Sequence, residues 1–362
     1  MGSLKALGEA LRFCKTSEDL NNINPVIRFL ILARICVVFM SIYAVVIGGL
    51  IAWIDGFSNI PIFISILIAF TLLHLADNLL NDYSDASRGI DGPGYERLLY
   101  APHPILSGLI NISTLKMFVA GVLIYSILLG IYLSYIVSPS IIVLTFIGIA
   151  IMLGYSGYGF DLKRSGLGEL GVFIVWGPII IGGTYLALTG IYTFSQALIY
   201  TPYGLTVSLV LIGKHLDKYS NDLSKGVYTL PIRIGFENAR KLGLIITLLS
   251  PVLAILGIYL YTGSLTSLSL LPIYISILPS IKAFNSGKPS EKPGGWSIWP
   301  LWFAAWGYQV MDVLGRYLIA TLIITGLYLY NEYMYMSLAI LTYLLIIISD
   351  IRNSRLYMKY LG

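Results

Sequence analysis

Apolar residues follow one another in runs of about 20 along most of this chain, and short polar stretches separate the runs. A helix of about 20 apolar residues is long enough to cross a hydrocarbon core about 30 Å thick. The pattern predicts spans at 34–53, 60–81, 113–136, 140–159, 168–189, 197–216, 240–261, 265–284, 313–330 and 333–349. We therefore expect an all-α fold, a polytopic transmembrane helical bundle with about nine to ten spans.

A further apolar stretch, residues 296–311, differs from these runs because it contains four tryptophans. Tryptophan prefers the headgroup level of a bilayer, so we interpret this stretch as an interfacial or re-entrant segment. We expect an ion pair between Asp312 and Arg316, four residues apart, at the start of the ninth span.

The basic residues are distributed unevenly between the two ends of the predicted helices. The loops near 54–59, 137–139, 190–196, 262–264 and 331–332 contain no Lys or Arg, whereas the alternate loops contain many. Cytoplasmic loops of membrane proteins carry such an excess of positive charge. We therefore predict a multi-pass protein of the cell membrane, with a cytoplasmic N-terminal segment (1–33), a transmembrane domain (34–349) and a cytoplasmic tail (350–362).

Composition supports this interpretation and excludes other classes. The chain is 57% hydrophobic and 11% charged, whereas soluble domains are about 25% charged. The net charge of +5 belongs to the inner membrane face, so we expect the lipid bilayer and no nucleic acid as a partner. The two cysteines, Cys14 and Cys36, match no metal-site spacing and are too few for a disulfide framework.

Acidic residues gather at the inner end of the second span. The candidate ligands there are Asn81, Asp82 and Asp85, with Asp91 beyond Gly89, where the chain can fold back. Asn81 and Asp85 are four residues apart and share a helix face. Because carboxylates near a membrane interface are costly, such a cluster requires a compensating ligand.

A second acidic cluster follows the sixth span and contains Asp217, Asn221 and Asp222. Both clusters end a helix that reaches the cytoplasm and begin a long inner loop, so we expect them to meet at one site. Two facing carboxylate clusters suit Mg²⁺, which binds oxygen ligands and bridges them to substrate phosphates. Arg34, Lys163, Arg164 and Lys225 are the candidate cations that would contact a diphosphate.

Two segments carry a resemblance to a known family. These are Asn81-Asp82-Tyr83-Ser84-Asp85 followed by Asp91, and the second aspartate segment with Lys225-Gly226 and Thr229–Gly235. They resemble the intramembrane prenyltransferases of the UbiA superfamily. The run from Gly159 to Glu169, with Trp176-Gly177-Pro178 after it, is similar to the branch that prenylates 1,4-dihydroxy-2-naphthoate in menaquinone synthesis.

The resemblance implies an active site at the cytoplasmic end of the bundle, two Mg²⁺ ions, a polyprenyl diphosphate donor and an aromatic acceptor. It implies catalytic roles for Asp82, Asp85, Asp217 and Asp222. The implied metal ligands are Asn81, Asp82, Asp85, Asp91, Asp217 and Asp222, and the spacing of the second cluster adds Asn221 as a further candidate.

One departure concerns the second motif, whose aspartates are usually four residues apart. Here Asp217 and Asp222 are five apart, and the residue four before Asp222 is Lys218, which cannot bind a metal. Either the helix ends between the two acids, or Asn221 is a ligand and one aspartate has another role.

Three functions are compatible with these patterns. The first is Mg²⁺-dependent transfer of a polyprenyl group to a dihydroxynaphthoate-like quinone precursor, with release of pyrophosphate. The second is prenyl transfer to a glycerol-phosphate ether lipid. The third is a divalent-cation transporter, which is disfavoured because transporter sites lie near the bilayer midplane, whereas these acids lie at helix ends.

Overall fold

The computed structural model describes residues 2–192 and 196–361, and within that part of the chain it contains helices and no strands. The N-terminal segment forms α1 (Gly2–Phe13), η1 (Leu20–Asn22) and α2 (Pro25–Leu32). The next helices are η2 (Ile35–Val37), α3 (Phe39–Ile54), α4 (Ile60–Ser87), α5 (Arg97–Tyr100), α6 (Ile112–Ile136) and α7 (Ser140–Tyr155). A continuous span then combines α8 (Gly168–Ile174), the π-helix η3 (Val175–Gly182) and α9 (Gly183–Thr189).

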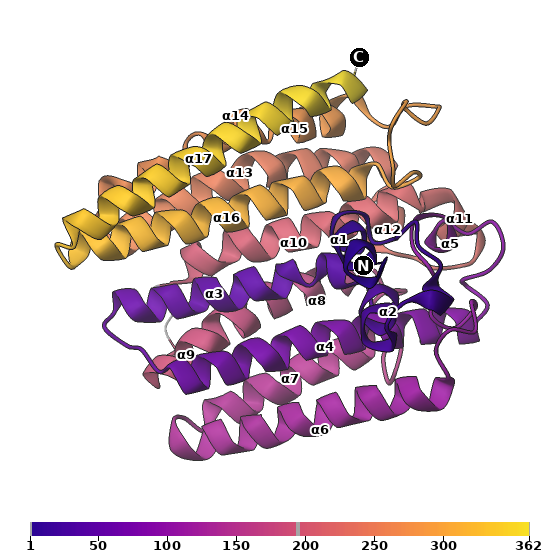
Figure 1. Cartoon of the computed structure of the whole chain (residues 1–362), viewed down its shortest axis with the longest axis horizontal. Coiled ribbons are helices and arrows are strands. Elements are labelled where there is room, and N and C mark those ends of the chain that lie inside the picture. Colours follow the sequence, from indigo (N-terminus) through magenta and orange to yellow (C-terminus); the bar gives the residue numbers. More distant parts are fainter. Residues whose placement is uncertain (1, 193–195, 362) are drawn as a thin grey trace.

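The second half of the chain repeats this pattern of long helices and short connecting ones. Its elements are α10 (Ala197–Asp217), α11 (Tyr219–Ser224), α12 (Leu230–Ile234), α13 (Phe236–Thr262), η4 (Leu265–Leu270), α14 (Ile273–Ser276), α15 (Leu278–Ser286), α16 (Phe303–Leu329), α17 (Tyr333–Tyr357) and η5 (Met358–Tyr360). The long helices run side by side, and the short α5, α11 and α12 lie together at one end (Figure 1). We call this end, which also carries both aspartate motifs, the motif end.

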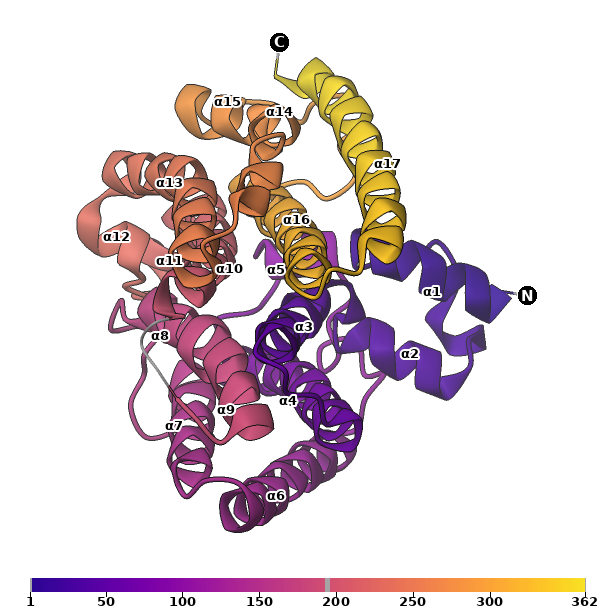
Figure 2. The same cartoon turned by 90° about the vertical axis from the view of Figure 1, so that its left-hand side faces the viewer.

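The bundle has an inner and an outer set of helices. Figure 2 looks along the bundle, with α3 and α16 near the centre and α6, α7, α13 and α17 towards the outside. The helix α10 packs against both α13 and α16. Glycines permit this close approach, since a Cβ added at Gly213 would lie 2.4 Å from the carbonyl oxygen of Phe303.

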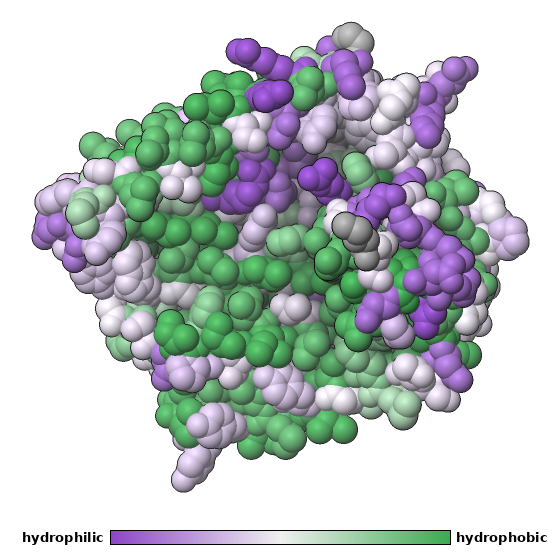
Figure 3. Space-filling model, in the orientation of Figure 1, coloured by the Kyte–Doolittle hydropathy of each residue, from purple (hydrophilic) through white to green (hydrophobic). Residues whose placement is uncertain are grey.

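The expected all-α bundle of membrane-spanning length is confirmed. In the described residues, eight helices are long and apolar enough to cross a bilayer, and the bent pair 265–276 and 278–286 makes a ninth. The remaining predicted span, 140–159, forms the apolar helix α7 of 16 residues. Hydrophobic residues cover much of the side of the bundle seen in Figure 3, and hydrophilic residues concentrate near the N-terminal helices and over α16 below α17.

The prediction for the tryptophan-rich stretch is wrong. The ninth span begins at Phe303, so residues 303–311 are its first turns and form no separate segment. Trp296, Trp302 and Trp306 pack against one another and are at most 7% exposed, so they fill the core and do not anchor the chain at an interface.

The charged pair on α16 forms as predicted, although deeper in the helix. Arg316 Nη2 lies 2.8 Å from Asp312 Oδ2, and Arg316 Nη1 lies 2.7 Å from Asp350 Oδ2 on α17. The second carboxylate explains how a long apolar helix tolerates an arginine, because charges inside a membrane protein are usually paired.

The cysteines have a structural role that their spacing did not indicate. Cys14, after α1, and Cys36, in η2, form a disulfide with a Cα–Cα distance of 5.2 Å. This bond holds the N-terminal helices against the start of the first span, close to Arg34.

Candidate active site

The first acidic motif occupies the last turns of α4, and its central residue is Asp82. This side chain is fully buried, and its two oxygens accept hydrogen bonds from Arg97 Nε at 3.0 Å and Arg97 Nη2 at 2.6 Å. Arg34 Nη2 lies 3.3 Å from Asp82 Oδ1. A buried carboxylate is therefore held between two guanidinium groups, and such pairing offsets the cost of removing it from water.

Arg34 reaches this position because the chain turns sharply between α2 and η2. Its backbone is left-handed, with φ 59° and ψ 54°, a conformation that is uncommon outside glycine. Arg34 Nη2 donates to the backbone oxygen of Asn78 at 2.9 Å, and Asn78 Nδ2 donates to the oxygen of Ala33 at 3.0 Å. The turn and these two bonds fix the guanidinium beside α4.

Asp85 is bound by residues from two sides. Lys163 Nζ lies 2.5 Å from Asp85 Oδ2, and Asn81 Nδ2 donates to the same oxygen at 3.4 Å. Lys163 belongs to the connection between α7 and α8. Ser84 Oγ secures that connection by donating to the oxygen of Ser156 at 2.6 Å.

The chain folds back after α4, as expected from Gly89. That glycine has φ +68°, and the amide of Ile90 donates to the oxygen of Asp85 at 2.9 Å. Asp91 Oδ2 then lies 3.1 Å from His103 Nε2. One ligand atom from each of Asp82, Asp91 and His103 falls within 4.8 Å of the others, and all three residues are buried.

The second motif has features of both arrangements that its spacing allowed, since the helix ends between the two acids and Asp217 has another role. The helix α10 ends at Asp217, Lys218 forms its C-cap, and α11 starts at Tyr219. The break turns Asp222 into the interior, where it is fully buried. Asp222 Oδ1 accepts a hydrogen bond from the Tyr95 hydroxyl and lies 3.7 Å from Lys218 Nζ.

The structure places Asp217 in an unexpected setting. Its two oxygens accept backbone N–H bonds from Trp302, Phe303 and Ala304 at 2.8–3.1 Å, and Lys288 Nζ lies 3.4 Å away. Asp217 thus caps the first turn of α16. The resemblance predicts a metal ligand and catalytic residue at Asp217, but both of its oxygens already accept hydrogen bonds from the backbone.

The loop of residues 88–111 joins the two motifs. Tyr95 in this loop contacts Asp222, and Asn221 Nδ2 donates to Glu96 Oε1 at 2.7 Å. Lys225 Nζ donates to the oxygen of Ile90 and lies 4.4 Å from the centre of the Tyr95 ring. The segments that carry Asp85 and Asp222 therefore form one polar cluster, as the sequence predicted.

Burial and neighbouring carboxylates together shift the pKa values of two lysines in this cluster, Lys163 and Lys218, which lie outside the membrane spans. Burial acts to lower the pKa of Lys163, but the carboxylates of Asp85 and Asp222 outweigh burial, so this pKa is raised. For Lys218, burial lowers the pKa although Asp222 opposes it. One ammonium thus interacts with an acid from each motif.

The donor set of the cluster fits a hard divalent cation. Several buried oxygens have no hydrogen-bond partner among the described residues; they are Asn81 Oδ1, Asp91 Oδ1, Glu96 Oε2 and Asp222 Oδ2. Buried polar atoms are normally satisfied, so an unpaired group of oxygens indicates a missing ligand. Carboxylate and amide oxygens are the ligands that Mg²⁺ takes in proteins.

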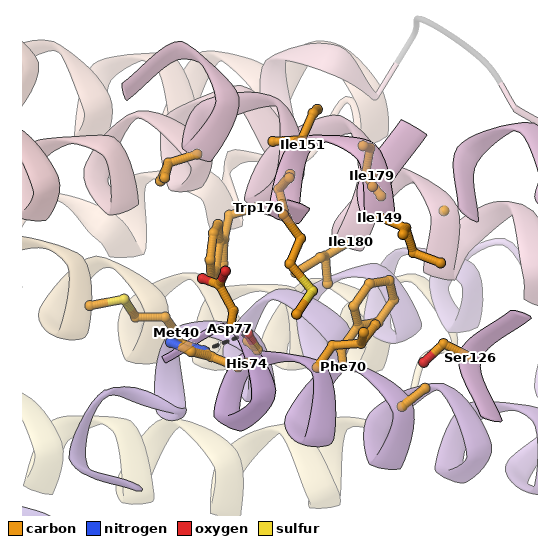
Figure 4. A pocket seen from close by; sticks show the side chains of 18 of the residues that line it. Met40, Phe70, His74, Asp77, Ser126, Ile149, Ile151, Trp176, Ile179 and Ile180 are labelled. Atoms are coloured by element: carbon orange, nitrogen blue, oxygen red, sulfur yellow. Dashed lines mark hydrogen bonds between the residues drawn. The ribbon is translucent and has the colours of Figure 1, made fainter. Parts of the chain in front are cut away.

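An apolar cavity of about 270 Å³ lies next to the cluster. Its walls come from α3, α4, α6, α7, η3, α9 and α10, and Figure 4 shows Phe70, Ile149 and Ile180 among the apolar side chains that line it. Arg34, Asn78, Asn81 and Lys214 line its polar end. The cavity therefore runs from the acidic motif into the hydrophobic interior of the bundle.

Most predicted site residues lie in this region, with two exceptions. Asp217 is a helix cap, and Arg164 is 38% exposed beside Asp161. Among the described residues, the Arg164 side chain forms no hydrogen bond to the acids of either motif, although its backbone oxygen accepts one from Arg233 Nη2 at 3.4 Å. Sequence reasoning did not select five residues that the structure adds, namely Asp77, Tyr95, Arg97, His103 and Lys218. Asp77 lies four residues before Asn81, a helical spacing that was readable in the sequence.

Comparison with known proteins gives the class of this chain, which is that of the membrane prenyltransferases. Residues 41–299 match the UbiA prenyltransferase family, and the chain belongs to that family. It is 26% identical over 215 residues to 1,4-dihydroxy-2-naphthoate octaprenyltransferase of Escherichia coli (strain K12), which covers 56% of this chain and 67% of that protein. It is also 24% identical over 196 residues to UbiA prenyltransferase domain-containing protein 1 of Xenopus tropicalis, covering 54% of this chain and 56% of that one.

Solved structures share the fold. A UbiA homolog from Aeropyrum pernix K1 superposes with a TM-score of 0.59 at 18% identity, covering 78% of this chain and 98% of that one. A UbiA homolog from Archaeoglobus fulgidus bound to GPP and Mg²⁺ gives a TM-score of 0.55 at 14% identity, covering 81% and 99%. The chain is thus a multi-pass membrane protein with the UbiA fold.

Proposed function

We propose that this protein transfers a polyprenyl group from its diphosphate to an aromatic quinone precursor of the dihydroxynaphthoate type, and releases pyrophosphate. The observation that carries this proposal is the continuity between the polar cluster and the apolar cavity. A prenyl diphosphate has a polyanionic head and a hydrocarbon tail, and the two parts match the two parts of this site. If these acids were only the solvated end of a helix, they would face water and not a buried apolar cavity.

On the donor side, we assign the diphosphate and its metal to the cluster between α4 and α11. Asn81, Asp82, Asp85 and Asp91 from the first motif, with Asn221 and Asp222 from the second, would hold Mg²⁺. Bound Mg²⁺ would bridge the acids to the diphosphate and neutralise charge on the leaving group. The unpaired buried oxygens of Asn81, Asp91 and Asp222 support this assignment.

The basic residues would bind the diphosphate directly. Lys163 lies 2.5 Å from Asp85, and Arg34 lies 3.3 Å from Asp82. Lys225, beside the Tyr95 ring, would contact the diphosphate from the second motif, and Arg164 is a weaker candidate because of its exposure. Such fixed cations stabilise charge that develops as the carbon–oxygen bond breaks.

The apolar cavity would hold the first part of the prenyl chain and exclude water. A carbocation-like chain reacts with any water that reaches it, so a dry wall protects the transfer to the acceptor. Relatives named as 1,4-dihydroxy-2-naphthoate octaprenyltransferases, from Escherichia coli and Bacillus subtilis, support an aromatic acceptor at 26% and 23% identity.

The acceptor can be tested directly. The purified protein in lipid would receive geranylgeranyl diphosphate, Mg²⁺ and either 1,4-dihydroxy-2-naphthoate or a geranylgeranylglyceryl phosphate, followed by product mass and pyrophosphate release. We expect a prenylated product from the naphthoate only. A product from the glyceryl phosphate alone would replace the acceptor assignment, and no pyrophosphate with either acceptor would overturn the proposal.

We also propose that the motif end faces the cytoplasm. The basic residues of the loops at this end support this orientation, because cytoplasmic loops carry an excess of Lys and Arg. Both chain termini lie towards the same end and would then be cytoplasmic as well (Figure 1). Cysteine labelling of single engineered cysteines in the 137–139 and 225–229 loops of intact cells would test it. Labelling of the second loop by a membrane-impermeant reagent would contradict the orientation.

A further inference from the structure

Two polar groups inside the cavity have no counterpart in the donor chemistry described above. Asp77 Oδ1 and Trp176 Nε1 are both buried and lack a hydrogen-bond partner among the described residues. Their polar neighbours are satisfied, since His74 Nδ1 pairs with Ser41 Oγ at 2.9 Å and Asn78 bonds to the backbone. Besides the unpaired Asn81 Oδ1 and Arg34 Nε at its polar end, the cavity therefore presents an unpaired acceptor on Asp77 and an unpaired donor on Trp176.

The two groups come from different walls of the same cavity. Asp77 lies on α4, one turn from Asn81, and Trp176 lies on the π-helix η3. Figure 4 shows the Asp77 side chain directed from α4 towards the Trp176 ring. His74 packs edge-on to this ring at a centroid distance of 5.3 Å, which fixes its orientation. A π-helix within an α-helical span often marks a functional position.

A carboxylate in an apolar cavity is unfavourable without a partner. Arg34 and Lys214 line the same cavity and interact electrostatically with Asp77, so part of this cost is offset. Neither residue forms a hydrogen bond or an ion pair with Asp77 in the described part of the chain. The carboxylate thus remains available to a ligand.

The prenyl diphosphate cannot be the ligand of Asp77, because its oxygens only accept hydrogen bonds and repel a carboxylate. The ligand must donate a hydrogen bond to Asp77, accept one from Trp176 and be flat and apolar between them. A hydroxylated aromatic compound has this combination. Building on the proposed function, we propose that Asp77 and Trp176 bind the aromatic acceptor and that Asp77 accepts its hydroxyl proton.

The transfer then balances as follows. The acceptor O–H bond breaks and its proton moves to Asp77, while a ring carbon beside that oxygen forms a bond to C1 of the prenyl chain. The C1–O bond to the diphosphate breaks, and its electron pair leaves with pyrophosphate. The hydrogen of the attacked ring carbon moves as a proton to the ring oxygen, which restores aromaticity, and Asp77 passes its proton to pyrophosphate.

The test compares Asp77→Asn and Trp176→Phe with a matched control, Asp55→Asn. Asp55 follows α3 at the end of the bundle far from the motif end. It accepts a hydrogen bond there from the Tyr185 hydroxyl at 2.6 Å. Binding of geranylgeranyl diphosphate with Mg²⁺, measured as a rise in Tm, should be equal in all four proteins. That equality also shows that each variant is folded.

We expect Asp77→Asn to lower kcat about 10²-fold or more, the usual contribution of a proton acceptor. Trp176→Phe should raise KM for 1,4-dihydroxy-2-naphthoate about fivefold with little change in kcat, because one neutral hydrogen bond is lost. Asp55→Asn should match the wild type. Titration of the naphthoate against tryptophan fluorescence, without donor, should show weaker binding to both site variants.

The outcomes separate this proposal from the proposed function. If the wild type binds the naphthoate, both site variants bind it more weakly and no prenylated product forms, the result would contradict the proposed function but not the acceptor site. Unchanged naphthoate binding and turnover in Asp77→Asn would overturn the present inference. Loss of the Mg²⁺–diphosphate stabilisation in that variant would also overturn it, since Asp77 would then belong to the donor site.

Discussion

The two aspartate motifs look alike in sequence but use their acids differently. In the first motif, Asp82 and Asp85 both face charged side chains, from Arg34, Arg97 and Lys163. In the second, Asp222 faces the cluster while Asp217 is bound by the backbone of α16. A carboxylate at a helix end can therefore either contribute to the active site or stabilise the fold. Here the break after α10 places Asp222 in the polar cluster and leaves Asp217 as a helix cap.

The largest effect is expected at the first motif. Asp85→Asn removes the negative charge that faces Lys163 and, in the proposed function, a metal ligand. We expect Mg²⁺-dependent pyrophosphate release to fall by about 10³-fold, comparable to the loss of a strong electrostatic contact in other active sites. Release of labelled pyrophosphate by the purified variant measures this. Wild-type release would remove Asp85 from the proposed site.

The different roles of the two aspartates in the second motif can be tested by substituting each of them. Asp222→Ala should lower turnover about 10²-fold with a small change in Tm, as expected for an active-site contact. Asp217→Ala should instead destabilise the protein by about 2 kcal/mol, because the first turn of α16 loses its cap. Thermal unfolding and turnover of the folded fraction measure both. An Asp217→Ala protein that is stable but inactive would instead indicate that Asp217 is a metal ligand, as the sequence predicted.

A smaller contrast separates the two neighbouring cations. Lys163 is buried and lies 2.5 Å from Asp85. Arg164 is 38% exposed, and its nearest carboxylate, that of Asp161, is 3.8 Å away. Lys163→Met should raise KM for the prenyl diphosphate more than about tenfold, since one charge-assisted contact is worth about 1.5–3 kcal/mol. Arg164→Gln should change KM by about twofold, because exposed ion pairs are weak. Equal effects would contradict the different placement of the two residues.

The smallest effect concerns the bridge between the motifs. Tyr95→Phe removes the hydroxyl that donates to Asp222 but keeps the ring beside Lys218 and Lys225. We expect about a fivefold loss in kcat/KM for the prenyl diphosphate, less than the full contribution of a hydrogen bond to a charged group, because the Asp222 charge is retained. Steady-state kinetics at fixed Mg²⁺ concentration measures it. A loss as large as that of Asp222→Ala would make the hydroxyl part of the catalytic centre.

The sequence predicted the parts of the molecule that depend on local pattern. Apolar runs predicted the helices, and the spacing of Asn81 and Asp85 predicted a shared face, which the bond of 3.4 Å confirms. The uneven spacing of Asp217 and Asp222 correctly allowed a helix that ends between them. These features depend on residues within one or two turns of each other.

Long-range contacts could not be predicted in the same way. The cap that Asp217 provides lies 85 residues further along the chain, at Trp302. The tryptophan-rich stretch 296–311 predicts a separate segment and so puts the start of the ninth span at 313, whereas α16 begins at Phe303. The contact that completes the pairing of Arg316 comes from Asp350 on α17, 34 residues away. Asp77 could not be identified as a site residue from the sequence in the same way. Trp176, which lines the same cavity, is far from it along the chain and becomes its neighbour only in the folded bundle.

The short helix α7 has a consequence for the surrounding membrane. Its 16 residues extend about 24 Å, several ångströms less than a typical hydrocarbon core of about 30 Å. Lipids beside this wall must shorten locally, or flanking residues must enter the apolar layer, and either adjustment costs energy that grows with bilayer thickness. The lipid chain length of the host membrane therefore bears on how well α7 is accommodated, whereas the eight longer candidate spans, with 20–28 residues each, have no such shortfall.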